Sequence, residues 1–190
     1  MSNTAQAPEH SRTAQRSVVN NISVLTIVDV EQIKSLNPNP SQDPDKPQPI
    51  HYNQGVTMRC PYDHFVSEPG PGNITFKANL QDTVSFRATT VSGNSENAVI
   101  VYKIKGNDSV NVFNPFLTNT ITRTGSVVPS SPNSVPPLTT PLTFYSFDSK
   151  IKSKGTEVFT IYLALYELDA SGENQVLYGY FYWDPTIQVQ

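Results

Sequence analysis

The sequence is poor in the features that would place the protein outside the cell or in a membrane. A single cysteine, Cys60, among 190 residues excludes an internal disulfide. The longest apolar runs, 98–102 and 161–166, fall far short of the roughly 18 residues that a membrane-spanning helix needs. Residues 1–17 are polar and lack the apolar segment of a secretory signal. We therefore expect a cytoplasmic protein without a membrane partner.

Charge is also scarce. Charged residues make up 15% of the chain, and 13 basic against 16 acidic residues leave a net charge of −3. A general nucleic-acid binder needs a basic face that displaces counterions from phosphates, so this balance excludes nucleic acid as an expected partner. The densest basic run is Lys150, Lys152 and Lys154, which is typical of a solvated turn.

The motifs that mark common enzymes are absent. The chain has no Gly-x-Ser-x-Gly elbow, no phosphate-binding Gly-x-x-x-x-Gly-Lys loop and no His-Glu-x-x-His pair. The densest titratable group is Cys60, Asp63 and His64, with His51 nearby, and its spacing matches no zinc signature. We expect no enzyme, no catalytic residues and no cofactor. A thiol enzyme that uses Cys60 and His64 remains a weaker alternative.

Apolar and polar residues alternate with a period of two over much of the chain, which predicts strands with one buried face. The segments 74–78 and 84–88 alternate in this way, and the residues between them predict a tight hairpin. Other predicted strands are 22–30, 98–105, 117–124, 142–147, 156–168 and 175–183. A short helical turn is predicted at 31–36, ended by Pro38. The pattern favours an all-β fold, an antiparallel β-sandwich.

Two proline-rich segments interrupt this pattern. Residues 37–49 and 126–141 each hold five prolines, and proline has no N–H to donate to a neighbouring strand. We therefore predict that both segments are long loops that cross between sheets or cover a sheet edge. Residues 1–20 are predicted to be a flexible N-terminal arm, and residues 21–190 a single β-sandwich domain.

Tyrosines gather near the end of the sequence. Tyr178, Tyr180 and Tyr182 share one face of a predicted strand, and Tyr162 and Tyr166 share a face of the strand before it. Tyrosine suits an interface because its ring can be buried while its hydroxyl stays paired, so we favour a subunit interface. The alternative is a ligand platform on which the rings stack against sugars.

An oxygen-rich loop offers a weak metal candidate. Asp43 and Asp45, with Ser41 and Gln42, carry the oxygen ligands that calcium prefers. The loop lacks the glycine and the closing glutamate of an EF-hand, so we expect no metal site and keep calcium as an alternative.

Several separate motifs resemble one protein family. They are Val24-Leu25-Thr26-Ile27-Val28-Asp29-Val30, Asn37-Pro38-Asn39-Pro40-Ser41-Gln42-Asp43, Asp82-Thr83-Val84-Ser85-Phe86-Arg87 and Trp183-Asp184-Pro185. In combination they resemble the AidA/PixA family of bacterial inclusion-body proteins, over residues 24–189. The resemblance implies an immunoglobulin-like sandwich, cytoplasmic accumulation, control by quorum sensing or growth phase, and a role in virulence or symbiosis. It implies no catalytic mechanism.

These observations lead to two hypotheses of different classes. The first is a non-enzymatic protein that self-associates, most simply as a twofold dimer that covers its open sheet edges. The second is a carbohydrate-binding, lectin-like module whose ligands are glycans, with or without calcium.

Overall fold

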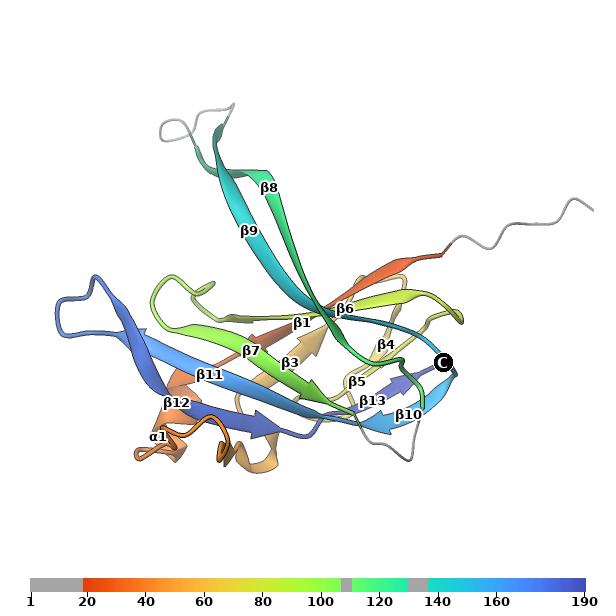
Figure 1. Cartoon of the computed structure of the whole chain (residues 1–190), viewed down its shortest axis with the longest axis horizontal. Helices are drawn as coiled ribbons and strands as arrows, with labels where there is room; N and C mark the ends of the chain where they lie inside the picture. The colour runs from red at the N-terminus through yellow and green to blue at the C-terminus, as the bar shows by residue number, and fades with distance from the viewer. Residues whose placement is uncertain (1–18, 107–110, 130–136) are drawn as a thin grey trace, which may run out of the picture.

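A computed structural model of the chain describes residues 19–106, 111–129 and 137–190 (Figure 1). Within these ranges the chain is mostly β-strand, and the strands form three sheets. The β1 sheet has the order β3 (Val56–Arg59), β1 (Asn21–Val28), β6 (Thr83–Thr90), β9 (Pro137–Lys150), β8 (Leu117–Pro129). The β12 sheet has the order β2 (Gln48–Pro49), β12 (Gln175–Trp183), β11 (Thr160–Leu168), β7 (Ala98–Lys105). The β13 sheet has the order β10 (Gly155–Val158), β13 (Thr186–Val189), β5 (Ile74–Phe76), β4 (Phe65–Ser67).

The sheets are mixed, so the prediction of a purely antiparallel fold was wrong. β1 and β6 run parallel from the Asn21–Thr83 pair to the Val28–Thr90 pair. β13 is parallel to β5, and β12 is parallel to β2. Parallel neighbours need a crossover connection, so these pairings show that the chain passes between sheets rather than turning back on itself.

The predicted hairpin of residues 74–78 and 84–88 is also wrong, because β5 and β6 belong to different sheets. The connection between them is held by Asp82, whose side chain is buried. Its carboxylate accepts hydrogen bonds from the backbone N–H groups of Asn20 and Asn79, each at 2.8 Å. The turn therefore joins the start of β1 to the crossover instead of closing a hairpin.

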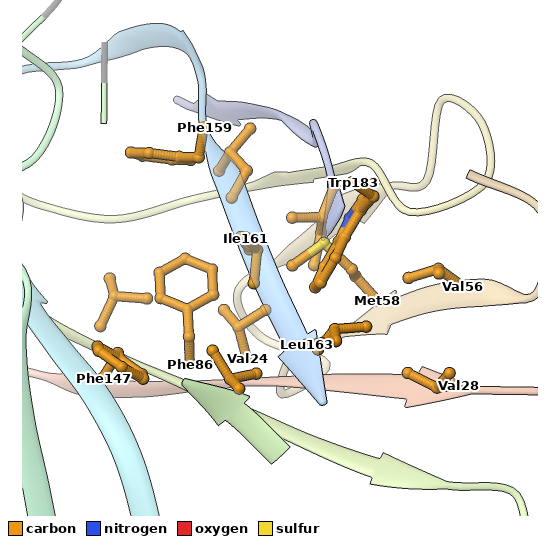
Figure 2. Close-up of a cluster of buried hydrophobic side chains, with 14 of the residues drawn as sticks. Val24, Val28, Val56, Met58, Phe86, Phe147, Phe159, Ile161, Leu163 and Trp183 are labelled. Carbon is orange, nitrogen blue, oxygen red and sulfur yellow. The ribbon is translucent and has the colours of Figure 1, made fainter. Parts of the chain in front are cut away.

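The core lies where side chains of the β1 sheet meet side chains of the β12 sheet (Figure 2). Alternate residues of β1 are buried, as the period of two predicted, and among them Val24 and Val28 point into this cluster. Opposite them lie Leu163 of β11 and Trp183 of β12. Each fully buried large side chain contributes about 1.5–3 kcal/mol, so this contact is the main source of stability.

The segment that follows β1 forms helix α1 (Val30–Leu36), which confirms the predicted helical turn. Asp29 caps its first turn, with its carboxylate accepting from the backbone N–H of Gln32 at 3.0 Å. The helix ends at Leu36, shortly before Pro38, because the residue preceding a proline avoids the helical region. A single 3-10 turn, η1 (His51–Asn53), precedes β3. Across the described ranges, no helix has the length and apolar character required to span a bilayer.

The first proline-rich segment covers a sheet edge, as predicted. Ser41 forms an isolated bridge with Tyr180, and the two residues of β2 pair with β12 in parallel. Pro49 is accommodated because β2 is the outermost strand of its sheet.

The second proline-rich segment contradicts the prediction of a loop. Pro129 ends β8 and pairs with Pro137 of β9, and Pro141 of β9 pairs with Thr124 of β8. The two strands form a long hairpin that projects from the body of the molecule (Figure 1). Among the described strands, β9 pairs only with β8 over residues 137–146, so its other edge tolerates prolines that lack an N–H. Pro132 and Pro136 lie outside the described residues.

The predicted strand at 156–168 is two strands in two sheets. Phe159, which is buried, separates β10 from β11, and its backbone N–H donates to the carbonyl of Pro185 at 3.2 Å. β12 ends at Trp183, before Pro185, and the chain then enters β13. The short strands β3, β4 and β13 were not predicted. Residues 1–18, the greater part of the predicted N-terminal arm, lie outside the described residues.

Candidate functional site

Four tyrosines meet on the face of the β12 sheet that points away from the core. They form the tyrosine cluster: Tyr102 of β7, Tyr162 of β11, and Tyr180 and Tyr182 of β12. The ring centroids of Tyr102 lie 5.9 Å from Tyr162 and 5.6 Å from Tyr180. The centroids of Tyr162 and Tyr182 lie 6.2 Å apart, and these two residues are direct cross-strand partners. All four side chains are half-buried.

A small residue in the central strand explains how rings from the two outer strands meet. Ala164 of β11 pairs with Tyr180 on one side and with Ile100 on the other. Its methyl group is short, so Tyr102 and Tyr180 can pack over β11, and Ala164 itself is only 4% exposed. A larger residue at this position would separate the two rings.

Sequence reasoning missed Tyr102 as a member of the cluster. The pairing of β7 with β11 shifts register between Tyr162 and Leu163, so Tyr102 lies in a β-bulge. Tyr102 still shares the outer face of Ile100, as alternation along β7 predicts, and what the sequence does not reveal is that β7 is the neighbour of β11. The neighbouring residue Lys103 places its ammonium 5.0 Å from the centroid of the Tyr162 ring, which adds a cation to the border of the cluster.

The loop at residues 37–49 forms the acidic side of the cluster. The Tyr102 hydroxyl donates to the carbonyl of Pro44 at 2.9 Å, and Gln42 Nε2 donates to the carbonyl of Tyr178 at 2.7 Å. Burial raises the pKa of Tyr102, and the nearby rings and the carboxylates of Asp45 and Asp43 raise it further. The Tyr102 hydroxyl therefore stays protonated and remains a hydrogen-bond donor at neutral pH.

The Asp43 carboxylate of this loop is engaged by its own turn. Asp43 Oδ1 accepts from the backbone N–H of Asp45 at 2.9 Å, and Asp43 Oδ2 lies 3.9 Å from the Lys46 ammonium. In the part of the chain that the structure describes, no three side chains of His, Cys, Asp or Glu converge as metal ligands. Within the described ranges, Asp43 and Asp45 are therefore two carboxylates without a third ligand side chain beside them.

The remaining two tyrosines of the sequence analysis lie elsewhere. Tyr178 lies at a register shift of β12 and stacks on Phe181, with ring centroids 6.3 Å apart. Its hydroxyl donates to the carbonyl of Asn37 at 2.7 Å, and the Lys34 ammonium lies 5.6 Å from its ring centroid. Tyr178 therefore anchors the end of α1. Tyr166 is half-buried, and the ring contacts of the described residues do not include it.

The hydrogen bonds that the structure describes for Cys60 and His64 involve backbone carbonyls, with Cys60 Sγ 3.8 Å from the carbonyl oxygen of Pro61. Burial raises the pKa of the Cys60 thiol to about 11, with only partial compensation from the charge of Arg59. The thiol is therefore protonated at neutral pH and is a poor nucleophile. His64 Nδ1 is engaged with the backbone carbonyl of Lys77 at 2.8 Å.

Comparison with known proteins identifies relatives of the whole described fold. The model of a family described as PixA, inclusion body protein, matches residues 20–189. A crystal structure of a PixA inclusion body protein from Burkholderia cenocepacia J2315 is 28% identical, with a TM-score of 0.77. The likeness covers 93% of this chain and 99% of that one. No curated protein matches the chain. Both matches confirm the resemblance found in the sequence, and the chain belongs to the PixA inclusion body protein family.

Proposed function

We propose that the chain is a non-enzymatic, self-associating protein of the inclusion-body type, and that the outer face of the β12 sheet is its contact surface. The observation that carries this proposal is the tyrosine cluster, in which four half-buried rings support one another on a face turned away from the core. Such rings supply contact area at low entropic cost, and a tyrosine hydroxyl can form a hydrogen bond while its ring is buried.

The edge of the same sheet also favours contact between copies. β7 is the outermost strand of the β12 sheet, so in the described ranges one of its edges has no neighbouring strand. Ile100 on this strand is 48% exposed, which leaves an apolar side chain beside the tyrosine cluster. A twofold dimer would either pair two such edges or pack the tyrosine face of one copy on that of the other.

The oligomeric state tests this proposal. Size-exclusion chromatography with light scattering at micromolar concentration is expected to give a dimer or a larger assembly. Tyr182→Glu is expected to dissociate it, because the interface would bury an unpaired carboxylate. Tyr62→Glu is the matched control, because Tyr62 is 92% exposed and outside the cluster. Circular dichroism checks that both variants fold. A monomeric parent protein would contradict the proposal.

A carbohydrate-binding function is the second candidate. It is supported by the position of Asp43 and Asp45 beside Tyr102, since stacking rings next to carboxylates suit the apolar faces and the hydroxyls of a sugar. A glycan array probed with and without calcium tests it, with Asp45→Asn as the variant expected to lose binding. No signal in either condition would remove this candidate.

Membership of the family supports a proposal about the wider setting of the function. We propose that the protein is bacterial, accumulates in the cytoplasm, and is produced under quorum-sensing or growth-phase control in association with a host. We further propose that the packing of the β1 sheet on the β12 sheet is an immunoglobulin-like sandwich. The support for that arrangement is the shared core in Figure 2, to which both sheets contribute.

A further inference from the structure

A cavity lies where β9 separates from β6. The two strands pair from Thr83 to Phe86 of β6, and beyond the Phe86–Phe147 pair β9 leaves the sheet with β8 to form the projecting hairpin (Figure 1). β6 continues to Thr90 with β1 as its partner. The fork between the strands holds a cavity of about 540 Å³, which we name the fork cavity.

The walls of the fork cavity are mixed: polar side chains, among them Thr89, Asn94 and Thr143, line the cavity beside a group of apolar ones. They include side chains of the β1 sheet and of β7: Leu25, Phe86, Val99, Val101, Phe144 and Phe147. The volume falls within the range of about 300–1,000 Å³ that is usual for small-molecule sites. The cavity is separate from the tyrosine cluster, because none of the four cluster residues lines it.

One cation lies in this setting without an acidic partner. Arg87 of β6 lines the cavity, and its Nε is buried without a hydrogen-bond acceptor. Its guanidinium carbon lies 5.8 Å from the centroid of the Phe144 ring. Among the described residues, Arg87 takes part in no ion pair, and no aspartate or glutamate lines the cavity.

Arg87 as a whole is half-buried, but a buried Nε–H without an acceptor is costly until one reaches it. The planar guanidinium matches a carboxylate, which accepts two parallel hydrogen bonds from it. The surrounding aromatic and branched side chains match an apolar body attached to that carboxylate. We propose that the fork cavity binds a small organic carboxylate with an aliphatic or aromatic body, and that Arg87 receives its carboxylate group.

Isothermal titration calorimetry tests this proposal with two probes, sodium decanoate below its micelle concentration and 4-phenylbutyrate. At least one of them is expected to bind the full chain, and decanol, which lacks the charge, is expected to bind more weakly than decanoate. Arg87→Met keeps an apolar stem but removes the charge, and it is expected to weaken carboxylate binding by about tenfold or more. Arg123→Met is the matched control, because Arg123 is exposed on β8 and the change in net charge is the same.

A second variant locates the site independently of charge. Ala88→Leu places a larger side chain in the wall of the fork cavity and is expected to reduce binding while Arg87 is retained. Thermal unfolding checks that each variant is folded. Failure of both carboxylates to bind the parent protein, or binding that Arg87→Met leaves unchanged, would overturn the proposal. Ile100 lines the cavity and also lies on the proposed contact edge of β7, so light scattering of the same samples gives the oligomeric state and separates a failure of carboxylate binding from a failure of self-association.

Discussion

Replacing Gly179 by alanine is expected to displace the loop that borders the tyrosine cluster. A Cβ atom at this position of β12 would overlap Cβ of Pro40 and lie 2.7 Å from its Cγ and 3.0 Å from the carbonyl oxygen of Ser41. Neither neighbour can turn aside, because one is a proline ring and the other is backbone. The backbone of the loop or of β12 must therefore move.

The expected loss in unfolding free energy can be estimated from these contacts. Overpacking of this kind costs about 1–3 kcal/mol, and a chain of this size loses roughly 2–4 °C in Tm for each kcal/mol. Movement of the loop also weakens the hydrogen bond that the Tyr180 backbone N–H donates to the Ser41 carbonyl, at 2.8 Å. The amide of Tyr180 is therefore expected to exchange with solvent faster in the Gly179→Ala variant.

Urea denaturation and amide hydrogen exchange together measure both effects. Gly70→Ala is the matched control, because a Cβ there meets only Asn73 Nδ2, at an ordinary 3.4 Å. Gly70 and Gly179 both lack the positive φ that would strain an alanine, so only the space around them differs. The control is expected to match the parent protein or exceed its stability by up to about 1 kcal/mol. Equal stability of the two variants, with unchanged Tyr180 exchange, would refute the packing of the loop on β12.

Three further predictions concern single residues. Burial alone would raise the pKa of Asp82, but hydrogen bonds from Asn20 and Asn79 outweigh it and hold this pKa below 3.8. At neutral pH the Asp82→Asn variant is therefore expected to have a lower free energy of unfolding than the parent protein. This difference is expected to disappear as the pH falls through the lowered pKa of Asp82, which urea denaturation at a series of pH values would measure. Trp183→Ala is expected to cost about 3–5 kcal/mol in unfolding free energy, because the indole is 1% exposed and its N–H donates to the Gly72 carbonyl; a loss below about 1 kcal/mol would contradict its place in the core. Cys60 is expected to react with iodoacetamide at pH 7 more slowly in the folded protein than in urea, because its pKa is raised to about 11; equal rates would show that the thiol is exposed.

The strands that could be predicted are those with one buried face. In β1, alternate side chains enter the core, and the period of two is visible in the sequence because each buried position must be apolar. The pairing of strands is less accessible, because alternation does not identify the neighbour. Residues 79–82 have the composition of a hairpin turn, yet Asp82 binds the backbone of Asn20, 62 positions away.

The site was predictable only in part, for a related reason. Tyr162, Tyr180 and Tyr182 follow regular alternation, and the structure brings them together. Tyr178 lies at a register shift and stacks on the core residue Phe181 instead, whereas Tyr102 joins the cluster because β7 pairs with β11, which alternation does not reveal. The fork cavity was not predicted because it depends on where β9 leaves β6, which is a property of the tertiary fold.

The parallel pairing of β13 with β5 has a consequence for biosynthesis. Thr75 and Gln188, which pair in these strands, are 113 positions apart in the sequence. In this sheet β13 lies between β10 and β5. A ribosome must therefore translate nearly all of the described chain before β5, which can pair with β4 on one edge, acquires β13 on the other. Contacts of such long range form slowly, so newly made chains pass through a stage in which the edge of β5 is open to other molecules. During that interval another copy of the chain is one of the molecules that can reach this edge.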